Sequence, residues 1–309
     1  MPITATHKIW MDGELVDWDA ANVHVLTHTM HYGSGVFEGI RAYRTSAGVA
    51  VFRLREHIER LMRSAAIFLI DVPFSCDQLV AAAREVVAVN HLDDGCYIRP
   101  LIYLGYGEMG LNPLPCPVNV AIAAWPWGSY LGDDGLANGV RVKVSSWRRH
   151  DANAVPTAAK GTGMYVNSSL AKVEALKSGY DEAILLSSDG RVSECTGENV
   201  FIVRDGDVLS PPTSDSGALA GITQLSVETI ARDLGLRVAR EPLVRTDLYT
   251  ADEAFLTGTA AEVVPICSVD DRIVGDGRPG AVTKEIQSTY FAAVRGEIDR
   301  YKGWLDHVR

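Results

Sequence analysis

The sequence lacks an excess of basic residues and any long apolar run. Acidic residues outnumber basic ones by 39 to 29, and the net charge of -10 argues against nucleic acid or an anionic membrane as the main partner. No stretch is long and apolar enough to span a bilayer, and the N-terminal residues show no apolar signal core. A membrane protein and a nucleic-acid-binding protein are therefore not expected.

Cysteine is also scarce. The five cysteines are an odd number, widely scattered and without a CxxC pair. This pattern provides neither a disulfide framework nor a zinc site and is typical of a reducing compartment, so the cytoplasm is the expected location. The sequence also shows no internal repeats and no low-complexity tracts.

What is present is the composition of an ordinary globular protein, with 47% hydrophobic and 22% charged residues. A length of 309 residues allows two domains or one large one with a sizeable core. The stretch 129–139, SYLGDDGLANG, is rich in glycine and polar residues and has no periodicity, so we predict an interdomain loop there. The predicted small domain is then 1–128 and the predicted large domain is 140–309.

Alternating apolar residues and turn dipeptides predict strands, and apolar residues at helical spacing predict helices. Hairpin turns are predicted at Asp12-Gly13, Asp189-Gly190 and Asp205-Gly206. The predicted strands cover 36–44, 49–54, 96–104, 118–125, a segment from 140 and 254–259. The predicted helices cover 55–69, 77–89 with Asp77 as N-cap, 165–177, 222–234 and 281–300.

Two motifs resemble binding sites but have unsuitable spacing or surroundings. His24, His28 and His31 would share one helical face, yet no acidic or cysteine partner lies nearby in the sequence, so we predict no metal site. The segment 33–39, GSGVFEG, resembles a dinucleotide fingerprint. Its last interval is one residue too long and it leads into a strand rather than a helix, which favours a glycine-rich entry to an active-site strand.

The predicted strand 96–104 carries an arginine among apolar and aromatic residues. A period of two places Tyr97, Arg99, Leu101 and Tyr103 on one face. Burying an arginine costs free energy unless it has a partner, so Arg99 is either an anion binder or half of a structural ion pair. Pro100 in the same strand predicts an edge or a bulge.

A lysine among small residues lies within 156–165, PTAAKGTGMY. The small neighbours would let a flat ligand approach the backbone closely. Lys160, with Tyr165 five residues later, suits carbonyl chemistry, because a desolvated amine loses its charge and can form a Schiff base. On these residues alone, a surface lysine in a flexible loop is the alternative.

Other segments provide the parts that pyridoxal phosphate needs. The helix start Gly221-Ile222-Thr223 offers N–H groups and a hydroxyl to a phosphate, although a plain N-cap threonine gives the same pattern. Glu194 offers a carboxylate for the pyridine nitrogen, which must stay protonated if the ring is to accept electrons. Arg60, for which a solvated helix arginine is the alternative, and the turn 257–260 complete the set.

Together these motifs closely resemble those of the branched-chain amino acid aminotransferases, within the pyridoxal-phosphate fold type IV group of class IV aminotransferases. The resemblance runs nearly from end to end, through HKIWMDGELV, HYGSGVFEGIR, YIRPL, VSSWRR, PTAAKGTGMY, GRVSECTGEN, GIT, TGTAAE and GWLDHV. It implies an α+β fold with two domains, a small α/β domain and a larger domain with a β-barrel-like core flanked by helices. It also implies pyridoxal 5'-phosphate as the cofactor and no metal.

The resemblance implies a role for each matching residue. Lys160 would form the internal aldimine and act as the base, Glu194 would pair with the pyridinium nitrogen, and Tyr165 would donate to the phenolic oxygen. The other implied residues are Arg60, Ile222, Thr223 and Thr259 at the phosphate, Tyr97, Thr259 and Ala260 at the substrate α-carboxylate, Arg99 at the γ-carboxylate of glutamate, Phe37, Tyr165 and Trp127 around the substrate side chain, and Tyr32 and Leu111 reaching into the neighbouring subunit's site.

The activity that the resemblance implies is ping-pong transamination of L-leucine, L-isoleucine and L-valine with 2-oxoglutarate, in a homodimer or higher homo-oligomer. The YIRPL and GTAAE motifs favour it over another fold type IV enzyme, namely a D-amino acid transaminase, an R-amine transaminase or an aminodeoxychorismate lyase. A dehydrogenase built on 33–39 and a non-catalytic binding protein are the further alternatives. The chain departs from the family pattern at Thr162, where glycine is frequent, and at Asp133-Asp134.

Overall fold

The computed structural model describes residues 3–128 and 130–309, which form two compact units. The first unit contains the described residues up to Trp127 together with Ala159–Met164 and Ala292–Arg309. The second contains the described residues of Gly128–Ala158 and Tyr165–Phe291. The predicted division at 129–139 assumed that each domain is one continuous stretch of chain. Each unit instead combines separate segments of the sequence. Most of that predicted loop is the helix α4 (Gly132–Asn138), while Ser129 lies outside the described residues.

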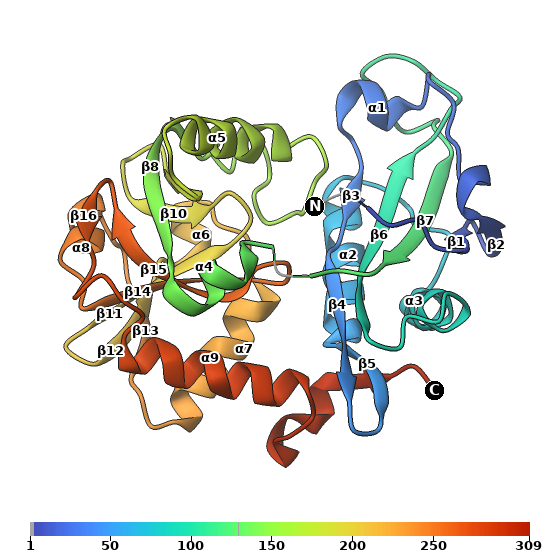
Figure 1. The fold of residues 1–309 in the computed structure, drawn as a ribbon. Coiled ribbons are helices and arrows are strands. Elements are labelled where there is room, and N and C mark those ends of the chain that lie inside the picture. Colours follow the sequence, from blue (N-terminus) through green and yellow to red (C-terminus); the bar gives the residue numbers. More distant parts are fainter. Residues whose placement is uncertain (1–2, 129) are drawn as a thin grey trace. The chain divides into compact units, whose positions relative to one another are not determined.

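The first unit is built on one antiparallel sheet, in the order β17-β5-β4-β6-β7-β1-β2, with β3 paired to β6 (Figure 1). The predicted hairpin at Asp12-Gly13 is confirmed, and both residues have positive φ as a two-residue turn of this kind requires. The strands are β1 (Lys8–Met11), β2 (Glu14–Asp17), β3 (Val36–Phe37), β4 (Ile40–Thr45), β5 (Gly48–Phe52), β6 (Gly95–Leu104), β7 (Val118–Trp125) and β17 (Leu305–His307).

Pro100 lies within the central strand β6, so the predicted edge is wrong. β6 pairs with β7 on one side and with β3 and β4 on the other. The Pro100 carbonyl accepts a hydrogen bond from the backbone N–H of Glu38, at 2.9 Å. Because the N and O of one strand residue point to the same side, the missing N–H of Pro100 also faces Glu38, so the ladder lacks the return bond where β3 and β4 are interrupted at Glu38 and Gly39.

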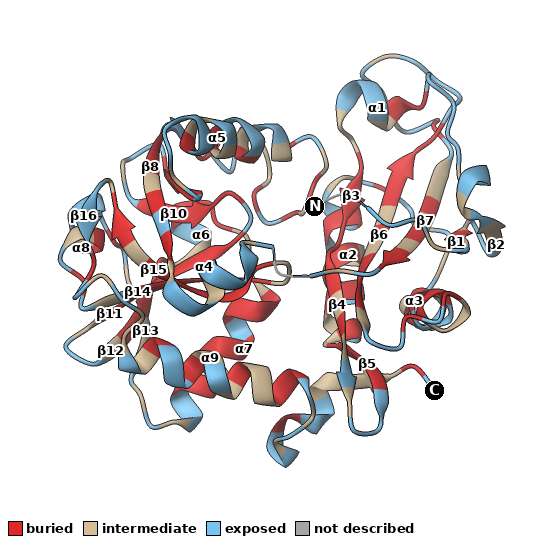
Figure 2. Cartoon of the chain, viewed as in Figure 1, coloured by how far each residue is buried: buried red, intermediate tan, exposed pale blue. Residues whose placement is uncertain are grey.

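Two helices pack on this sheet and bury its core. α2 (Leu54–Ile67) contacts β3, and α3 (Cys76–Val89) contacts β1, β6 and β7. Figure 2 shows the buried residues along α2 and the central strands. The N-cap of α3 is Ser75 and not Asp77, because Ser75 and Gln78 exchange the two hydrogen bonds of a capping box. Two short helical segments, α1 (His28–Tyr32) and η1 (Trp18–Ala20), precede them in the chain.

The second unit contains a curled mixed sheet in the order β10-β9-β8-β15-β14-β11-β12-β13, with β16 paired to β15. Only three residues join β10 to β11, yet four strands separate them in the sheet, and the two strands contact each other. The sheet must therefore curl back on itself. Its strands are β8 (Val140–Arg148), β9 (Glu182–Leu186), β10 (Val192–Cys195), β11 (Asn199–Arg204), β12 (Asp207–Ser210), β13 (Val238–Arg240), β14 (Glu253–Gly258), β15 (Glu262–Val269) and β16 (Arg272–Ile273).

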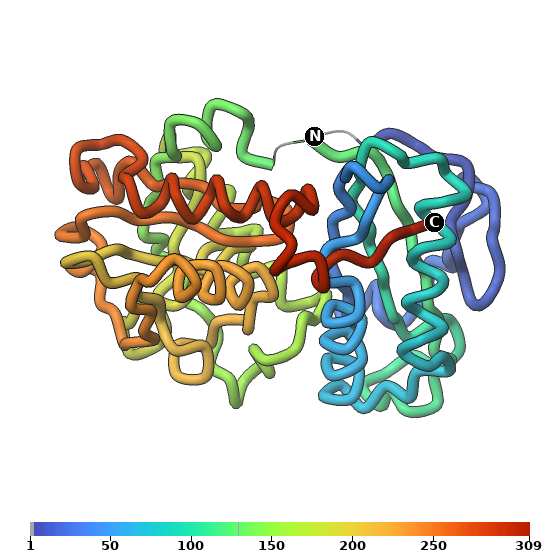
Figure 3. Tube along the Cα trace, turned by 90° about the horizontal axis from the view of Figure 1, so that it is seen from below, coloured from blue at the N-terminus to red at the C-terminus, as the bar shows by residue number. Residues whose placement is uncertain are grey.

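The predicted helix 165–177 is confirmed as α5 (Tyr165–Lys177), and Gly179, with φ +81°, ends it. The predicted helix 281–300 is too long, because α9 (Ala281–Val294) stops before Gly296, which has φ +74°. The chain then forms a 3-10 turn, η2 (Asp299–Trp304), and adds β17 to the first sheet (Figure 3). The remaining helices are α6 (Thr213–Ser216), α7 (Ile222–Asp233) and α8 (Arg245–Tyr249).

Candidate active site

In the first unit, the segment that carries Lys160 is bound along the entry to β3. The Lys160 carbonyl accepts from the N–H of Phe37 at 3.1 Å, and the Lys160 N–H donates to the Ser64 hydroxyl at 3.0 Å. A few residues further on, a Cβ added to Gly33 would come within 2.6 Å of Gly163 Cα, so the two backbones can approach this closely only without side chains. The glycines of 33–39 thus serve close packing, as the non-dinucleotide interpretation predicted.

Two cations lie close to the ring of Phe37. Lys160 Nζ is 5.2 Å and Arg99 Cζ is 4.8 Å from the ring centroid, both within cation–π range. Arg99 also donates to the Tyr97 hydroxyl at 3.1 Å, and Tyr97 packs against Trp127 with ring centroids 4.8 Å apart. The structure therefore gathers predicted substrate and cofactor residues of the first unit around one aromatic ring.

Arg99 has no carboxylate within ion-pair distance among the described residues. A structural ion pair, the alternative left open by the sequence, therefore has no partner there, which favours the anion-binder interpretation. Gly39 leaves room for the adjacent phenol, since a Cβ at Gly39 would lie 1.9 Å from the Tyr97 hydroxyl oxygen.

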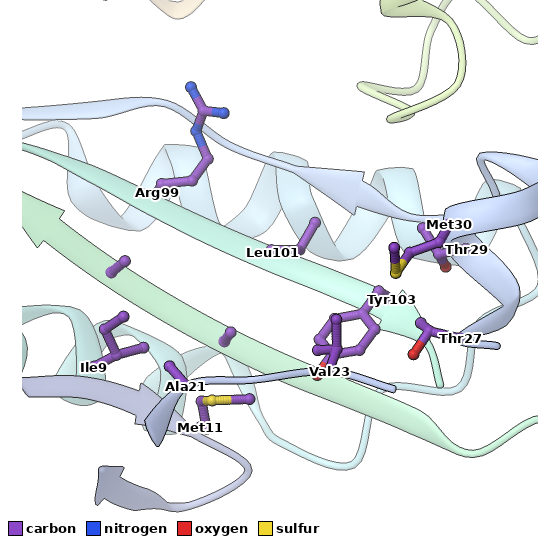
Figure 4. Close-up of a pocket in the computed structure, with 12 residues that line it drawn as sticks. Ile9, Met11, Ala21, Val23, Thr27, Thr29, Met30, Arg99, Leu101 and Tyr103 are labelled. Atoms are coloured by element: carbon purple, nitrogen blue, oxygen red, sulfur yellow. The ribbon is translucent and has the colours of Figure 1, made fainter. Parts of the chain in front are cut away.

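The predicted face of β6 borders an apolar groove of about 260 Å³ (Figure 4). Arg99, Leu101 and Tyr103 follow one another along it, with the guanidinium at one end, which confirms the period-two interpretation of this strand. Apart from Arg99 the lining is mostly aliphatic: Ile9, Met11, Ala21, Val23, Thr27, Thr29, Met30, Ala121 and Ala123.

Arg60 is buried and ion-paired, so the solvated-arginine alternative is wrong. Its side chain binds Glu38 through two bonds, Nε to Oε1 at 2.6 Å and the second guanidinium nitrogen to Oε2 at 2.9 Å. His57 Nδ1 lies 2.8 Å from the same Oε2. Burial would raise the pKa of Glu38, but the charges of Arg60 and His57 outweigh it and hold the pKa well below its ordinary value. Glu38 therefore fixes the orientation of the Arg60 guanidinium.

In the second unit, Glu194 on β10 is a buried carboxylate that is already paired. Its two oxygens accept from the Arg149 guanidinium and from the N–H of Leu219, each at 2.8 Å. Arg149 is itself buried and donates through Nε to the Gly217 carbonyl at 3.1 Å. An ionised carboxylate has about four lone-pair sites, so a further donor can bind to this fixed group.

Glu198 lies close to Glu194 in the chain, but its pKa is raised. It is buried with Glu182, whose oxygens accept from Thr196 Oγ1 at 2.6 Å, Lys172 Nζ at 2.7 Å and the N–H of Ala183 at 2.7 Å. Burial and then repulsion from Glu182 raise the pKa of Glu198 to about 8. The raised pKa favours the protonated form of Glu198, which leaves the arginine-paired Glu194 as the better partner for a cation.

The helix α7 begins as the sequence predicted, but Gly221 rather than Thr223 is its N-cap. Ile222 and Thr223 are the first two helical residues, and N–H groups at such positions have no intrahelical acceptor. Thr259 and Ala260 form the turn between β14 and β15 and are half-buried. Tyr165 is the first residue of α5. The second unit thus holds the remaining predicted phosphate and carboxylate positions.

The three histidines do not form a metal site. His28 is buried, with Nδ1 2.9 Å from Ser34 Oγ and Nε2 2.8 Å from the Gly110 carbonyl, and His31 Nε2 binds the Val25 carbonyl. Across residues 3–128 and 130–309, no group of three potential ligands is arranged to hold a metal ion.

Sequence reasoning missed Glu38, His57 and Arg149. The sequence did indicate that His57 and Arg60 lie close together, because residues three apart on a helix share a face. No such signal connects them to Glu38, which lies between two short strands nineteen residues upstream of His57.

Known proteins share this fold and these motifs. The amino-transferase class IV family matches residues 35–269, which is more than half of the chain. The chain therefore belongs to the amino-transferase class IV family. This result confirms the predicted family and the predicted α+β fold class, and it argues against the dehydrogenase alternative.

Particular relatives extend the match to nearly the whole chain. The branched-chain-amino-acid aminotransferases of Escherichia coli (strain K12) and Pseudomonas aeruginosa are 48% and 46% identical to it over 301 residues, with 97% of each chain covered. A crystal structure of the Escherichia coli branched-chain amino acid aminotransferase has a TM-score of 0.96 at 47% identity and covers 98% of this chain and 100% of that one. The branched-chain amino acid aminotransferase of Thermobaculum terrenum, solved in its PLP-form, has a TM-score of 0.93 at 34% identity, with 99% of each chain covered.

Proposed function

We propose that this protein is a branched-chain-amino-acid aminotransferase, which transfers the amino group of L-leucine, L-isoleucine or L-valine to 2-oxoglutarate and so gives the branched-chain 2-oxo acid and L-glutamate. The observation that carries the proposal is the likeness, over 97% of the chain and at 46–48% identity, to relatives that bear this name. The position of Arg99 over the rings of Phe37 and Tyr97 supports it, since aliphatic and acidic side chains must bind in turn.

The residues present fit pyridoxal 5'-phosphate as the cofactor. The chain offers an amine beside an aromatic ring, a fixed carboxylate that can accept another hydrogen bond, and a helix start with unsatisfied N–H positions. The backbone of Gly197 borders open space, because a Cβ built there would meet nothing within 4 Å. When bound, this cofactor supplies an electron sink for a carbanion at the substrate α-carbon.

The resemblance implies a role for each residue, and the chemistry of each side chain supports it. Lys160 would provide the amine that holds the cofactor aldehyde and would carry a proton to and from the substrate α-carbon. Glu194, paired with Arg149, would accept from the ring nitrogen. Tyr165 donates to the phenolic oxygen.

The proposed phosphate-binding residues are Arg60, Ile222, Thr223 and Thr259. Arg60 brings a charge that Glu38 holds in one orientation, while Ile222 and Thr223 bring helix N–H groups and a hydroxyl. The substrate α-carboxylate binds Tyr97 and the backbone of Thr259 and Ala260.

A donor panel with 2-oxoglutarate tests the proposed function. We expect turnover with L-leucine, L-isoleucine and L-valine and little with D-alanine or an R-amine, because the carboxylate-binding groups fix the orientation of the α-carbon. A preference for D-alanine over L-leucine would contradict the proposal and favour another fold type IV enzyme.

The Arg99→Leu variant should affect the reactions with L-leucine and L-glutamate differently. We expect the half-reaction with L-leucine to stay within about threefold of wild type, while kcat/KM for L-glutamate falls by about 10- to 150-fold, because a charge-assisted contact of about 1.5–3 kcal/mol is lost. Single-turnover spectroscopy with each donor measures the two steps. Equal losses of kcat/KM for L-leucine and L-glutamate would show that Arg99 does not bind the γ-carboxylate.

We further propose that the protein acts as a homodimer or larger homo-oligomer in the cytoplasm. Two apolar residues that the resemblance assigns to a neighbouring subunit's site are exposed, Leu111 at 88% and Tyr32 at 43%. All five cysteines are free, which supports a reducing compartment. In the described residues, no helix has the length and apolar character needed to cross a membrane. A monomer in sedimentation velocity would contradict the oligomer.

A further inference from the structure

The side chain of Thr162 cross-links two glycine-rich segments. The Thr162 hydroxyl donates to the Gly33 carbonyl at 2.9 Å, lies 3.2 Å from the Gly35 carbonyl and accepts from the Gly35 N–H at 3.2 Å. The backbone adds two bonds, Thr162 N–H to the Gly35 carbonyl at 2.8 Å and Gly163 N–H to the Gly33 carbonyl at 3.1 Å. A glycine at 162 could make the backbone bonds but not the hydroxyl bonds.

The bonds at 162 and 163 are part of what holds the segment that carries Lys160. Its neighbours Ala159, Gly161 and Gly163 have almost no side chain with which to anchor the segment by packing. Besides the bonds at 162 and 163, the backbone of Lys160 is held by Phe37 and Ser64. A small displacement at 162 would therefore move the amine two residues away relative to Phe37.

The other end of the cross-link is a helix terminus. Gly33 is the C-cap of α1, has φ +65° and donates its N–H to the Thr29 carbonyl at 2.9 Å. The Gly33 carbonyl accepts hydrogen bonds from the Thr162 hydroxyl and from the Gly163 N–H. Ser34, between the two bonded glycines, pairs with the buried His28 of the same helix. The lysine segment is thus bonded directly to a structured element and not to a free loop.

We propose that Thr162 is a positioning residue, whose hydroxyl holds the lysine segment on Gly33 and Gly35 and so sets the position of the Lys160 amine. This inference rests on the proposed role of Lys160. It predicts that the hydroxyl, and not the bulk of the side chain, is what the segment needs.

Thr162→Val and Thr162→Ser in the holoenzyme test the proposal. With valine, amide hydrogen exchange of 33–35 and 159–164 should be roughly five- to tenfold faster, because the Gly35 N–H loses its acceptor and the backbone bonds of Thr162 and Gly163 lose the hydroxyl bonds beside them. The pH midpoint of the cofactor's visible absorption should also shift by about 0.5 pH unit or more, because the amine has moved. Serine should restore both values. Thr162→Ala, which adds no bulk, replaces the valine variant if that variant does not fold.

Thr283→Val is the matched control, because it also removes a buried hydroxyl bond, from Thr283 in α9 to Glu253 in β14, within the second unit. It should leave both readouts at wild-type values. Exchange in Thr162→Val equal to wild type, or serine behaving like valine, would overturn the proposal. Faster exchange with an unchanged absorption midpoint would reduce Thr162 to a structural role. Because exchange does not require Lys160 to be the cofactor-binding amine, a failed role for Lys160 would appear separately in Lys160→Ala.

Discussion

Lys160→Ala is expected to lose transaminase activity by at least about 10⁴-fold, together with the visible absorption of the bound cofactor. The loss is large because one amine both binds the cofactor aldehyde and carries the proton, and proton transfer alone contributes about 10²–10⁴-fold. Stopped-flow measurement of each half-reaction, with absorption spectra of the resting enzyme, gives both quantities.

The control for this variant is Lys177→Ala. Lys177 is exposed in the last turn of α5 and should change neither quantity. Added methylamine should partly restore proton transfer in Lys160→Ala, since the free amine can enter the space left by the side chain. Ordinary turnover without Lys160, or an unchanged visible spectrum, would contradict its assignment as the catalytic amine.

The elements that the sequence predicted well are those with local causes. The hairpin at Asp12-Gly13 follows from a two-residue turn with positive φ, and α5 follows from apolar spacing that ends at a glycine. The face of β6 follows from a period of two. The errors also have physical causes: Ser75 competes with Asp77 for one cap, and α9 ends at Gly296 although the apolar pattern continues.

The site was predicted only through the likeness to a family, because its contacts are distant in the chain. Arg149 pairs with Glu194 across 45 residues, and no sequence pattern specifies that pairing. Glu38 and Arg60 are 22 residues apart. The pairing of Arg60 with Glu38 excludes the alternative of a solvated helix arginine, which its position on the flank of an amphipathic helix had left open. Local patterns indicate which residues form an element, whereas such pairs depend on how elements pack.

Glu38→Gln should destabilise the protein by about 3–5 kcal/mol, the typical cost of breaking a buried ion pair from one side. The side chain of Glu38 is fully buried, and its loss of charge would leave the Arg60 guanidinium uncompensated next to His57. The shape of the side chain is nearly unchanged, so a cavity does not contribute. Urea unfolding at pH 7 measures the change, and cofactor affinity should fall as well because Arg60 loses its fixed orientation.

The exposed pair Arg44–Asp94 provides the matched control. Its N–O distance is 2.6 Å, equal to that of Arg60–Glu38, but its side chains are 74% and 86% exposed. Asp94→Asn should therefore change stability little, since solvent already screens the pair. The pKa of folded Glu38 is depressed, so its contribution is present above the ordinary value of 4.5 and is lost as the pH falls below it. The difference between wild type and Glu38→Gln should shrink over that acidic range, and equal urea midpoints at pH 7 would show that this buried pair does not stabilise the fold.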